Sequence, residues 1–372
     1  MGSFKTLAPL ICCALLMQSA GVTAGQATDY VDVLDLPAKA SALAQRSPLL
    51  DLARAGSRLV AVGQRGHILY SDDEGGHWQQ ARVPVSSDLN AVTFPTPEQG
   101  WAVGGDGVVL HSQDGGASWQ KQLDGRQIGE LVLRHYSALA RAEPGRERWP
   151  QWVEEGQRLV EEGADKPLLD VWFEDDKVGY VVGVFNLILR TQDGGLHWTP
   201  MQDRTDNPDG LHLNAITRAG DALYLVGEQG LLRKWEPQTQ RFVSLPSPYD
   251  GSFFGLIGRP DEVIVYGLRG HVYRSTDGGQ QWVRLASPLP ISISAAMEGA
   301  DGQFRLFTQA GHMLLQQGNE PLTLAPPGRA IAGGGRRPDR RWHPGAGGQP
   351  RGAHPWRQIR CLNAGRHRMT AQ

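Results

Sequence analysis

The first candidates for chemistry in this sequence are aspartates that recur at matching positions of a repeated octapeptide. The copies read SDDEGGHW (71–78), SQDGGASW (112–119), TQDGGLHW (191–198) and STDGGQQW (275–282). Carboxylates at a defined separation are the machinery of glycoside hydrolysis, so these acids raise hydrolysis as one function to weigh.

Repetition argues against catalysis by the octapeptide, because a catalytic acid is needed once and a hairpin brace is needed in every repeat. Its hydroxyl and carboxylate can bond the free backbone groups of a tight turn. Its glycine adopts backbone angles that other residues avoid, and its tryptophan packs from the following strand. We therefore interpret it as a structural Asp box. The residues assigned to it are Ser71, Asp73, Gly75, Trp78, Ser112, Asp114, Gly116, Trp119, Thr191, Asp193, Gly195, Trp198, Ser275, Asp277, Gly279 and Trp282.

A second set of small or polar residues lies in the segments expected to form the innermost strands. These segments align around Asp51, Asn90, Asp170, Asn214, Gly255 and Ser294. Apolar neighbours flank each of them, so we expect the set to point toward a central channel and to bond water and loop backbone there. The alternatives are a ligand or cation site, or a catalytic pair formed by Asp51 and Asp170.

The elements that position these residues are short strands in a long repeat. The unit runs V-G, a glycine turn, an apolar strand and then the octapeptide, and it returns about every 40 residues. In the second unit, turn residues bound four strands over 89–94, 100–105, 108–112 and 118–123. A period near 40 with four strands per unit is typical of a β-propeller. We predict an all-β propeller of four-stranded blades, of the seven-bladed type, with six readable blades and a doubtful last one.

One interval is about twice the usual length and contains an insertion over 124–166. Segments 131–142 and 148–163 have the pattern of short amphipathic helices. Trp149, Trp152, Leu159 and Val160 could form an apolar stripe there. The insertion precedes the third Asp-box blade, and long insertions in a regular array usually serve binding. The alternative is that its tryptophans pack on the propeller.

Partner binding is expected on the face that carries the turns between the second and third strands of each blade. The sequences GQRGH (63–67) and GLRGH (267–271) place Arg65 and Arg269 at such turns, and arginine is common at binding hot spots. With Trp149 and Trp152 of the insertion they form the predicted partner-binding set. No spacing typical of a metal site and no phosphate-binding loop occurs, so we expect no metal and no cofactor.

The two ends of the chain differ from the repeat. Residues 1–24 have the pattern of a secretory signal peptide, which predicts export to the periplasm or secretion, with no membrane-spanning segment after cleavage. The propeller is expected over 28–327. Residues 328–372 are rich in glycine, proline and arginine, which predicts a basic tail that is disordered or read in a shifted frame. Because 329–372 holds ten arginines and one aspartate while the net charge is −2, the body is acidic. An acidic body argues against nucleic-acid binding.

The stretches GWAVGGDGVVLHSQDGGASW (100–119) and VGYVVGVFNLILRTQDGGLHW (178–198) resemble the photosystem II stability and assembly factor family, and the resemblance extends over about residues 30–325. It implies a seven-bladed propeller on the export side of a membrane that binds newly made membrane-protein subunits. We thus expect a non-catalytic scaffold, or assembly and stability factor, for a membrane or envelope protein complex. The alternative is a sialidase-like Asp-box glycosidase acting through the channel carboxylates.

Overall fold

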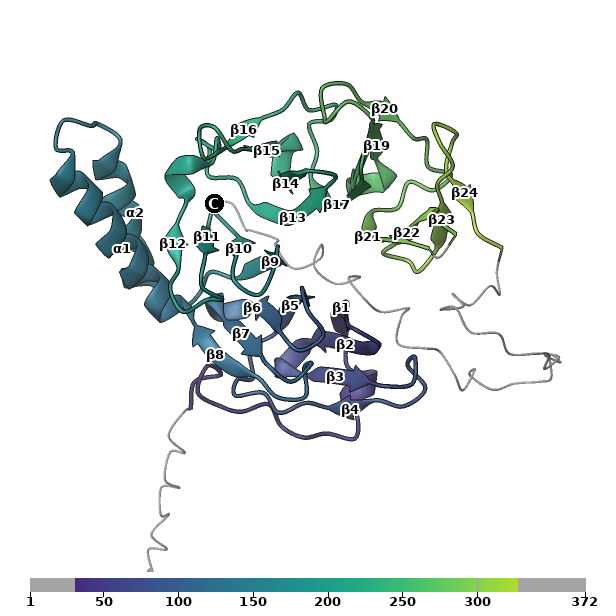
Figure 1. The fold of residues 1–372 in the computed structure, drawn as a ribbon, viewed down its shortest axis with the longest axis horizontal. Helices are drawn as coiled ribbons and strands as arrows, with labels where there is room; N and C mark the ends of the chain where they lie inside the picture. The colour runs from purple at the N-terminus through teal and green to yellow at the C-terminus, as the bar shows by residue number, and fades with distance from the viewer. Residues whose placement is uncertain (1–30, 300, 327–372) are drawn as a thin grey trace, which may run out of the picture. The chain divides into compact units, whose positions relative to one another are not determined.

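Six antiparallel sheets of four strands follow one another in the described part of the chain, residues 31–299 and 301–326 of a computed structural model (Figure 1). The predicted signal peptide (1–24) and the predicted basic tail (328–372) lie outside these residues. Each sheet is built from four consecutive strands, called a to d from the innermost outward. The six sheets are called blades 1 to 6 in chain order.

The strands have these bounds. Blade 1 holds β1 (Leu49–Ala55), β2 (Arg58–Gly63), β3 (Ile68–Ser71) and β4 (Gln79–Gln80); blade 2 holds β5 (Leu89–Thr93), β6 (Gly100–Gly104), β7 (Val109–Ser112) and β8 (Gln120–Leu123). Blade 3 holds β9 (Leu168–Phe173), β10 (Gly179–Gly183), β11 (Ile188–Thr191) and β12 (Thr199–Pro200); blade 4 holds β13 (Leu213–Ala219), β14 (Ala222–Gly227), β15 (Leu232–Glu236) and β16 (Arg241–Ser244). Blade 5 holds β17 (Phe253–Arg259), β18 (Glu262–Gly267), β19 (Val272–Ser275) and β20 (Val283–Arg284); blade 6 holds β21 (Ile293–Glu298), β22 (Phe304–Thr308), β23 (Met313–Leu315) and β24 (Thr323–Leu324).

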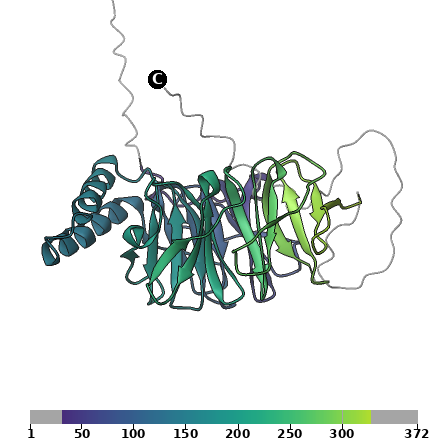
Figure 2. The same ribbon diagram turned by 90° about the horizontal axis from the view of Figure 1, so that it is seen from above.

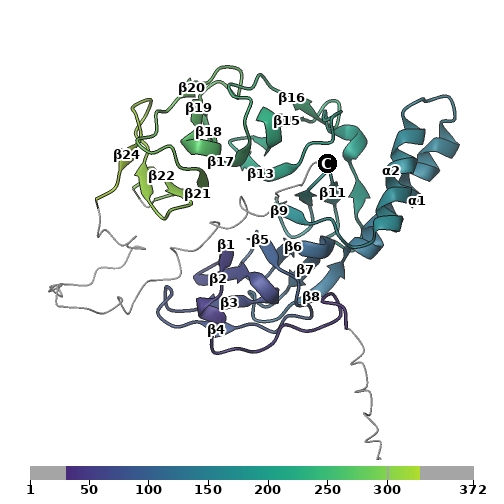
Figure 3. The same cartoon turned by 180° about the vertical axis from the view of Figure 1, so that it is seen from behind.

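The blades are arranged radially, with the a strands innermost. Contacts between these strands run in order from β1 to β5, β9, β13, β17 and β21. Figure 3 shows the same succession from behind. The predicted propeller is therefore confirmed, and the six readable repeats are the six blades. The four strands expected in the second repeat are β5 to β8, with ends that differ by at most two residues.

Each Asp box closes its own c–d hairpin with the same bonds of its hydroxyl and carboxylate. In the first, second and fourth boxes the tryptophan indole adds a bond that Trp198 of the third box does not make among the described residues. In the second box, Ser112 Oγ donates to Asp114 Oδ1 at 2.9 Å, and the backbone N–H of Gly116 donates to Ser112 Oγ at 2.8 Å. The indole N–H of Trp119 returns to the Gly116 carbonyl at 3.0 Å. The four carboxylates are thus distributed over four separate hairpins and do not gather in one cleft.

Packing between blades explains the apolar content of the b strands, and blade 6 is the exception. Strands β6 and β10 are buried along their whole length, and β2, β14 and β18 are buried except at their first residue, because both faces of these strands are covered. In blade 1 one of the two faces is covered by Ala44 of the N-terminal segment. Strand β22 alternates between buried and half-buried residues. Phe307 and the facing Met313 therefore lie on a side of blade 6 that the described residues do not fully cover.

The described residues of the N-terminal segment do not pair with blade 6. The carbonyl of Val33 accepts from the N–H of Ser86, and the N–H of Ala38 donates to Val83. Leu34 is buried in the core shared by blades 1 and 2. The segment therefore pairs with the loop that joins blades 1 and 2. Blade 6 consists of its own four strands.

The insertion forms two helices, α1 (Gly125–Ala142) and α2 (Trp149–Glu162), as the sequence predicted. Asp124 caps α1 in a reciprocal arrangement with Gln127. The helices cross closely at Gly129 and Gly156, where a Cβ atom would lie 2.9 Å and 2.6 Å from the backbone of the other helix. Both helices lie at the side of the blades, near one rim (Figure 2). Among the described residues, none of the helices combines the length and the hydropathy needed to span a bilayer.

Candidate functional site

The b–c turns share one backbone geometry, and blade 3 departs from the others in sequence. At the tip of the turn one residue takes a left-handed conformation in five blades: Arg65, Asp106, Phe185, Gln229 and Arg269, with φ between 49° and 58°. In four of these blades the next residue is a glycine, also at positive φ. Blade 3 instead has Asn186 at φ 61°. A bulky aromatic residue at positive φ, as at Phe185, is a rare feature of the kind that clusters at functional sites.

Close approach of the d–a loop explains the glycine in the other blades. A Cβ atom at Gly66 would lie 2.2 Å from the carbonyl oxygen of Val85, and one at Gly230 would lie 2.1 Å from that of Tyr249. The b–c turns and d–a loops therefore share one face. In blade 3 the d–a loop takes another path, through the short 3-10 helix Gln202–Arg204, and leaves room for the side chain of Asn186.

Asn186 uses that room to hold the loop. It is almost fully buried, its Nδ2 donates to the Gln202 carbonyl at 3.3 Å, and its Oδ1 accepts from Asn207 Nδ2 at 3.1 Å. Asn207 also exchanges two bonds with the backbone of Leu211. The turn and the loop of blade 3 are thus joined by side chains that the other blades lack.

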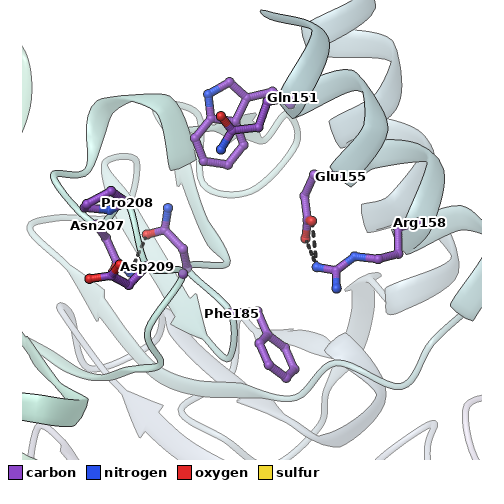
Figure 4. Close-up of a pocket in the computed structure, with 10 residues that line it drawn as sticks. Gln151, Glu155, Arg158, Phe185, Asn207, Pro208 and Asp209 are labelled. Atoms are coloured by element: carbon purple, nitrogen blue, oxygen red, sulfur yellow. Dashed lines mark hydrogen bonds and ion pairs between the residues drawn. The ribbon is translucent and has the colours of Figure 1, made fainter. Parts of the chain in front are cut away.

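A pocket of about 260 Å³ opens between α2, this turn and this loop (Figure 4). Trp152 from α2 and Phe185 from the turn are its aromatic walls. Its charged groups are Glu155 and Arg158 from α2 and Asp209 from the loop. Phe185 is 39% exposed, and it is the one aromatic residue among the exposed large hydrophobic residues of the described part of the chain.

The charges of the pocket are unequally matched. Arg158 donates from one nitrogen to both carboxylate oxygens of Glu155, at 2.7 Å and 2.6 Å. Among the described residues no hydrogen bond or ion pair engages the carboxylate of Asp209. Lys166, which lies between α2 and β9, has its ammonium group 5.9 Å from the centre of the Phe185 ring. It is paired with Glu162 and with Asp165.

Tyr136 of α1 fixes the insertion to the same loop. Its hydroxyl lies 3.1 Å from Asp203 Oδ1 and 3.2 Å from Gln202 Oε1, and it accepts from the N–H of Asp203. Burial, with the adjacent Asp203, raises the pKa of the Tyr136 hydroxyl well above its ordinary value. The phenol therefore stays neutral and acts as a hydrogen-bonding anchor. Trp152 stacks on the Tyr136 ring at 5.5 Å.

The residues expected to bind a partner do not all meet at this pocket. Trp152 lines it, whereas Trp149 is 3% exposed and donates from its indole to Glu143, so it belongs to the core of the insertion. Arg65 and Arg269 are exposed at the turns of blades 1 and 5, outside the pocket lining. Val160, included in the expected apolar stripe, is 43% exposed and lies outside the core.

The ring of inner-strand residues makes lateral bonds between blades. Asp51 accepts from the N–H of Val92 at 2.9 Å, and Asn90 donates to the Leu168 carbonyl at 2.7 Å. Blades 3 and 4 repeat this pair, since Asp170 accepts from Ile216 at 3.0 Å and Asn214 donates to Phe253 at 2.7 Å.

A β-bulge accounts for the alternation and corrects the alignment of this ring. The register of every a strand shifts by one residue at its start. Asn90, Asn214 and Ser294 occupy the extra residue of the bulge, whereas Asp51, Asp170 and Gly255 follow it. The six aligned residues therefore occupy two different strand positions, the bulge residue and the residue that follows it. Ser294 is buried and its hydroxyl has no hydrogen-bond partner among the described residues. Within the same part of the chain, no three potential metal ligands come together.

Sequence reasoning missed Phe185, Asn186, Asn207 and Asp209. The signal was present, because blade 3 reads VGVFNL where the other Asp-box blades have a glycine at the fifth position. The missing glycine marks blade 3, whose d–a loop takes a different path from the loops of the other Asp-box blades.

Comparison with known proteins gives consistent matches. The sequence model of the family described as Photosynthesis system II assembly factor YCF48 matches residues 38–133 and 151–312. Photosystem II assembly lipoprotein Ycf48 of Synechococcus sp. (strain CC9902) is 28% identical over 143 residues, which are 37% of this chain and 42% of that protein. The chain thus matches less than half the length of this curated relative.

Similar solved structures show the fold. One of them, "YCF48 bound to D1 peptide", has a TM-score of 0.52 at 16% identity and covers 75% of this chain and 82% of that one. YCF48 from Cyanidioschyzon merolae has a TM-score of 0.54 at 14% identity, covering 75% and 85%. The WD40 propeller domain of Doa1 has a TM-score of 0.51 at 11% identity, covering 80% and 87%. The likeness to both YCF48 and WD40 structures supports the propeller architecture.

Proposed function

We propose, because the chain belongs to the Photosynthesis system II assembly factor YCF48 family, that it is a protein-binding scaffold that assists the assembly or stability of a membrane or envelope protein complex. Its proposed partner is a polypeptide segment of such a complex, which is the class of ligand in the similar structure of YCF48 bound to D1 peptide. We propose further that it acts without catalysis and on the export side of a membrane, as the pattern of residues 1–24 and the name of the curated relative support.

The observation that carries the proposal is the rebuilt turn of blade 3 beneath the insertion. Four of the six blades repeat the Asp-box hairpin, and blades 1 to 4 alternate two kinds of inter-blade bond from their inner strands; both patterns serve stability. Blade 3 adds a buried asparagine and an altered loop, and it places an aromatic residue at the left-handed position that other blades fill with arginine, aspartate or glutamine. Strained backbone conformations cluster at ligand clamps and active sites, which supports this turn as the proposed contact.

The channel carboxylates give the glycosidase alternative no support. Asp51 and Asp170 each accept a backbone N–H from the next blade, which is the structural use of a carboxylate. The four Asp-box carboxylates are engaged in their own hairpins.

Site-specific photo-crosslinking tests the proposal. A benzoylphenylalanine is placed at residue 185, and in a control chain at residue 229, the same tip position in blade 4. In cells that express the full chain, we expect residue 185 to capture a defined membrane or envelope protein that residue 229 does not. Purification through that captured protein should recover this chain, and recovery should fall with Trp152→Ala. Equal capture of unrelated proteins from both positions would refute the proposal.

Point variants suit this experiment better than deletion of 124–166. Ile128, Val132 and Leu159 of the insertion share one core with Leu187 and Trp198 of blade 3. Removing both helices would therefore expose apolar surface on the propeller and confuse loss of binding with loss of folding.

A further inference from the structure

We infer that the pocket between α2 and blade 3 accepts a positively charged side chain, lysine or arginine, from the partner polypeptide. This inference rests on the proposed function and specifies its chemistry. It differs from the expectation based on Arg65 and Arg269, in which the chain itself supplies the cations.

The size of the pocket suits one side chain. Pockets that take drug-sized ligands measure about 300–1,000 Å³, and this one measures about 260 Å³. Its walls are Trp152 and Phe185, and aromatic faces attract ammonium and guanidinium groups. Lys166, which lies over the Phe185 ring at 5.9 Å, shows that a face of this ring already accommodates a cation.

The charge of the lining favours the same ligand. Arg158 is the one cationic side chain among the lining residues, and both of its contacts to Glu155 are short. Asp209 faces it from the opposite loop as a second carboxylate. Among the described residues it makes no hydrogen bond or ion pair. Its charge does act on the guanidinium of Arg233, because burial lowers the pKa of that group and Asp209 works against the lowering. A cation from outside would thus give Asp209 a direct ion pair, whereas an anion would meet the carboxylates of both Glu155 and Asp209 in the lining.

Helix α2 extends the acidic character beyond the pocket. Its sequence WPQWVEEGQRLVEE holds four glutamates and one arginine. Like charges near a binding site raise the local concentration of an oppositely charged ligand and speed its association. A basic segment of a partner is therefore the polypeptide that this surface fits.

Short capped peptides of one design test the inference on the full chain. Acetyl-Gly-Xaa-Gly-amide is prepared with arginine, lysine, leucine, glutamate or citrulline as Xaa; citrulline has nearly the shape of arginine without its charge. Binding is followed by the NMR shift of the Trp152 indole N–H, which is assigned by its loss in Trp152→Phe. We expect the arginine and lysine peptides to bind at least tenfold more tightly than the citrulline peptide, and more weakly at high salt.

A matched pair of variants locates the charge. Asp209 lies in NPDG (207–210) and Asp250 in PYDG (248–251), the same part of the d–a loop in consecutive blades. Asp209→Asn should weaken the arginine peptide about fivefold or more, and Asp250→Asn should leave it unchanged. Citrulline or leucine binding within twofold of arginine, or equal effects of the two variants, would overturn the inference. Crosslinking from residue 185 in that case would leave the proposed function standing with another ligand chemistry.

Discussion

Asn207 donates a hydrogen bond from Nδ2 to Oδ1 of Asn186 at 3.1 Å, across the space that a backbone carbonyl fills at the corresponding turns of blades 1, 4 and 5. This bond joins the turn that carries Phe185 to the loop that carries Asp209. The pocket therefore depends on two amides that are buried beneath it.

Asn186→Gly tests that dependence. Glycine keeps the left-handed backbone, so the change removes only the side-chain bonds to Gln202 and Asn207. Leaving buried polar groups unpaired costs about 1–3 kcal/mol, and we expect a loss of that size in urea unfolding. We also expect faster amide exchange over 205–211. A variant that matches the wild type in both measurements would show that the amides do not hold the loop.

Phe185→Gly separates binding from stability. Removing a left-handed non-glycine conformation returns about 1–2 kcal/mol, which offsets the lost ring contacts and the extra freedom of glycine. We expect an unfolding free energy within about 1 kcal/mol of the wild type and a clear loss of binding to the arginine peptide. Gln229→Gly, at the same tip in blade 4, should behave alike in unfolding and leave binding intact.

Trp119→Ala tests the packing role of the Asp box. The indole is 4% exposed, packs edge-on against Phe94 at 5.9 Å and donates to its own turn. Truncating a buried tryptophan costs about 3–5 kcal/mol, which we expect in chemical denaturation. A loss below about 1 kcal/mol would show that this indole is dispensable.

Asp170→Asn tests the inter-blade bonds of the inner strands. Its two oxygens accept from Val171 and Ile216, both at 3.0 Å, whereas an amide offers a single acceptor. One backbone N–H would lose its partner, at a cost of about 1–3 kcal/mol. Asp261→Asn, in an exposed turn, is the control and should have little effect. Hydrolysis of a glycoside panel by the wild type, abolished in Asp170→Asn, would instead revive a catalytic role.

Acid should loosen the Asp-box hairpins. The backbone N–H groups of His77 and Gln281 lower the pKa of Asp73 and Asp277, respectively. A carboxylate with a lowered folded-state pKa stabilises the fold above its ordinary value of 3.8, and this contribution is lost as the pH falls further. We expect urea midpoints to drop from pH 5 to pH 2, with a shallower drop in Asp277→Ala. An unchanged slope in that variant would contradict the assignment.

The repeat predicted the fold well because most blades reuse the same local interactions. Turn glycines, the Ser–Asp–Trp bonds of the hairpin and the fully apolar b strands are local patterns that a single sequence displays. The helices of the insertion were predictable for the same reason, since their apolar positions follow a helical period.

The site was harder to predict because it depends on contacts between distant segments. Sequence alone did not distinguish buried Trp149 from pocket-lining Trp152, three residues away on one helix. The bulge in each a strand was equally hidden, so Asp51 and Asn90 were taken as equivalent. Asp209 acquires its place only through the altered path of its loop.

The altered turn in blade 3 breaks the approximate rotational symmetry of the propeller. Five b–c turns share one backbone conformation, and the pocket with the aromatic walls lies at the turn of blade 3. A ligand that needs those walls would therefore bind beside that blade. Each copy of the chain would then bind one partner segment, always in the same orientation. The bound segment could then be presented to the complex under assembly in one fixed orientation, which a propeller with identical blades could not ensure.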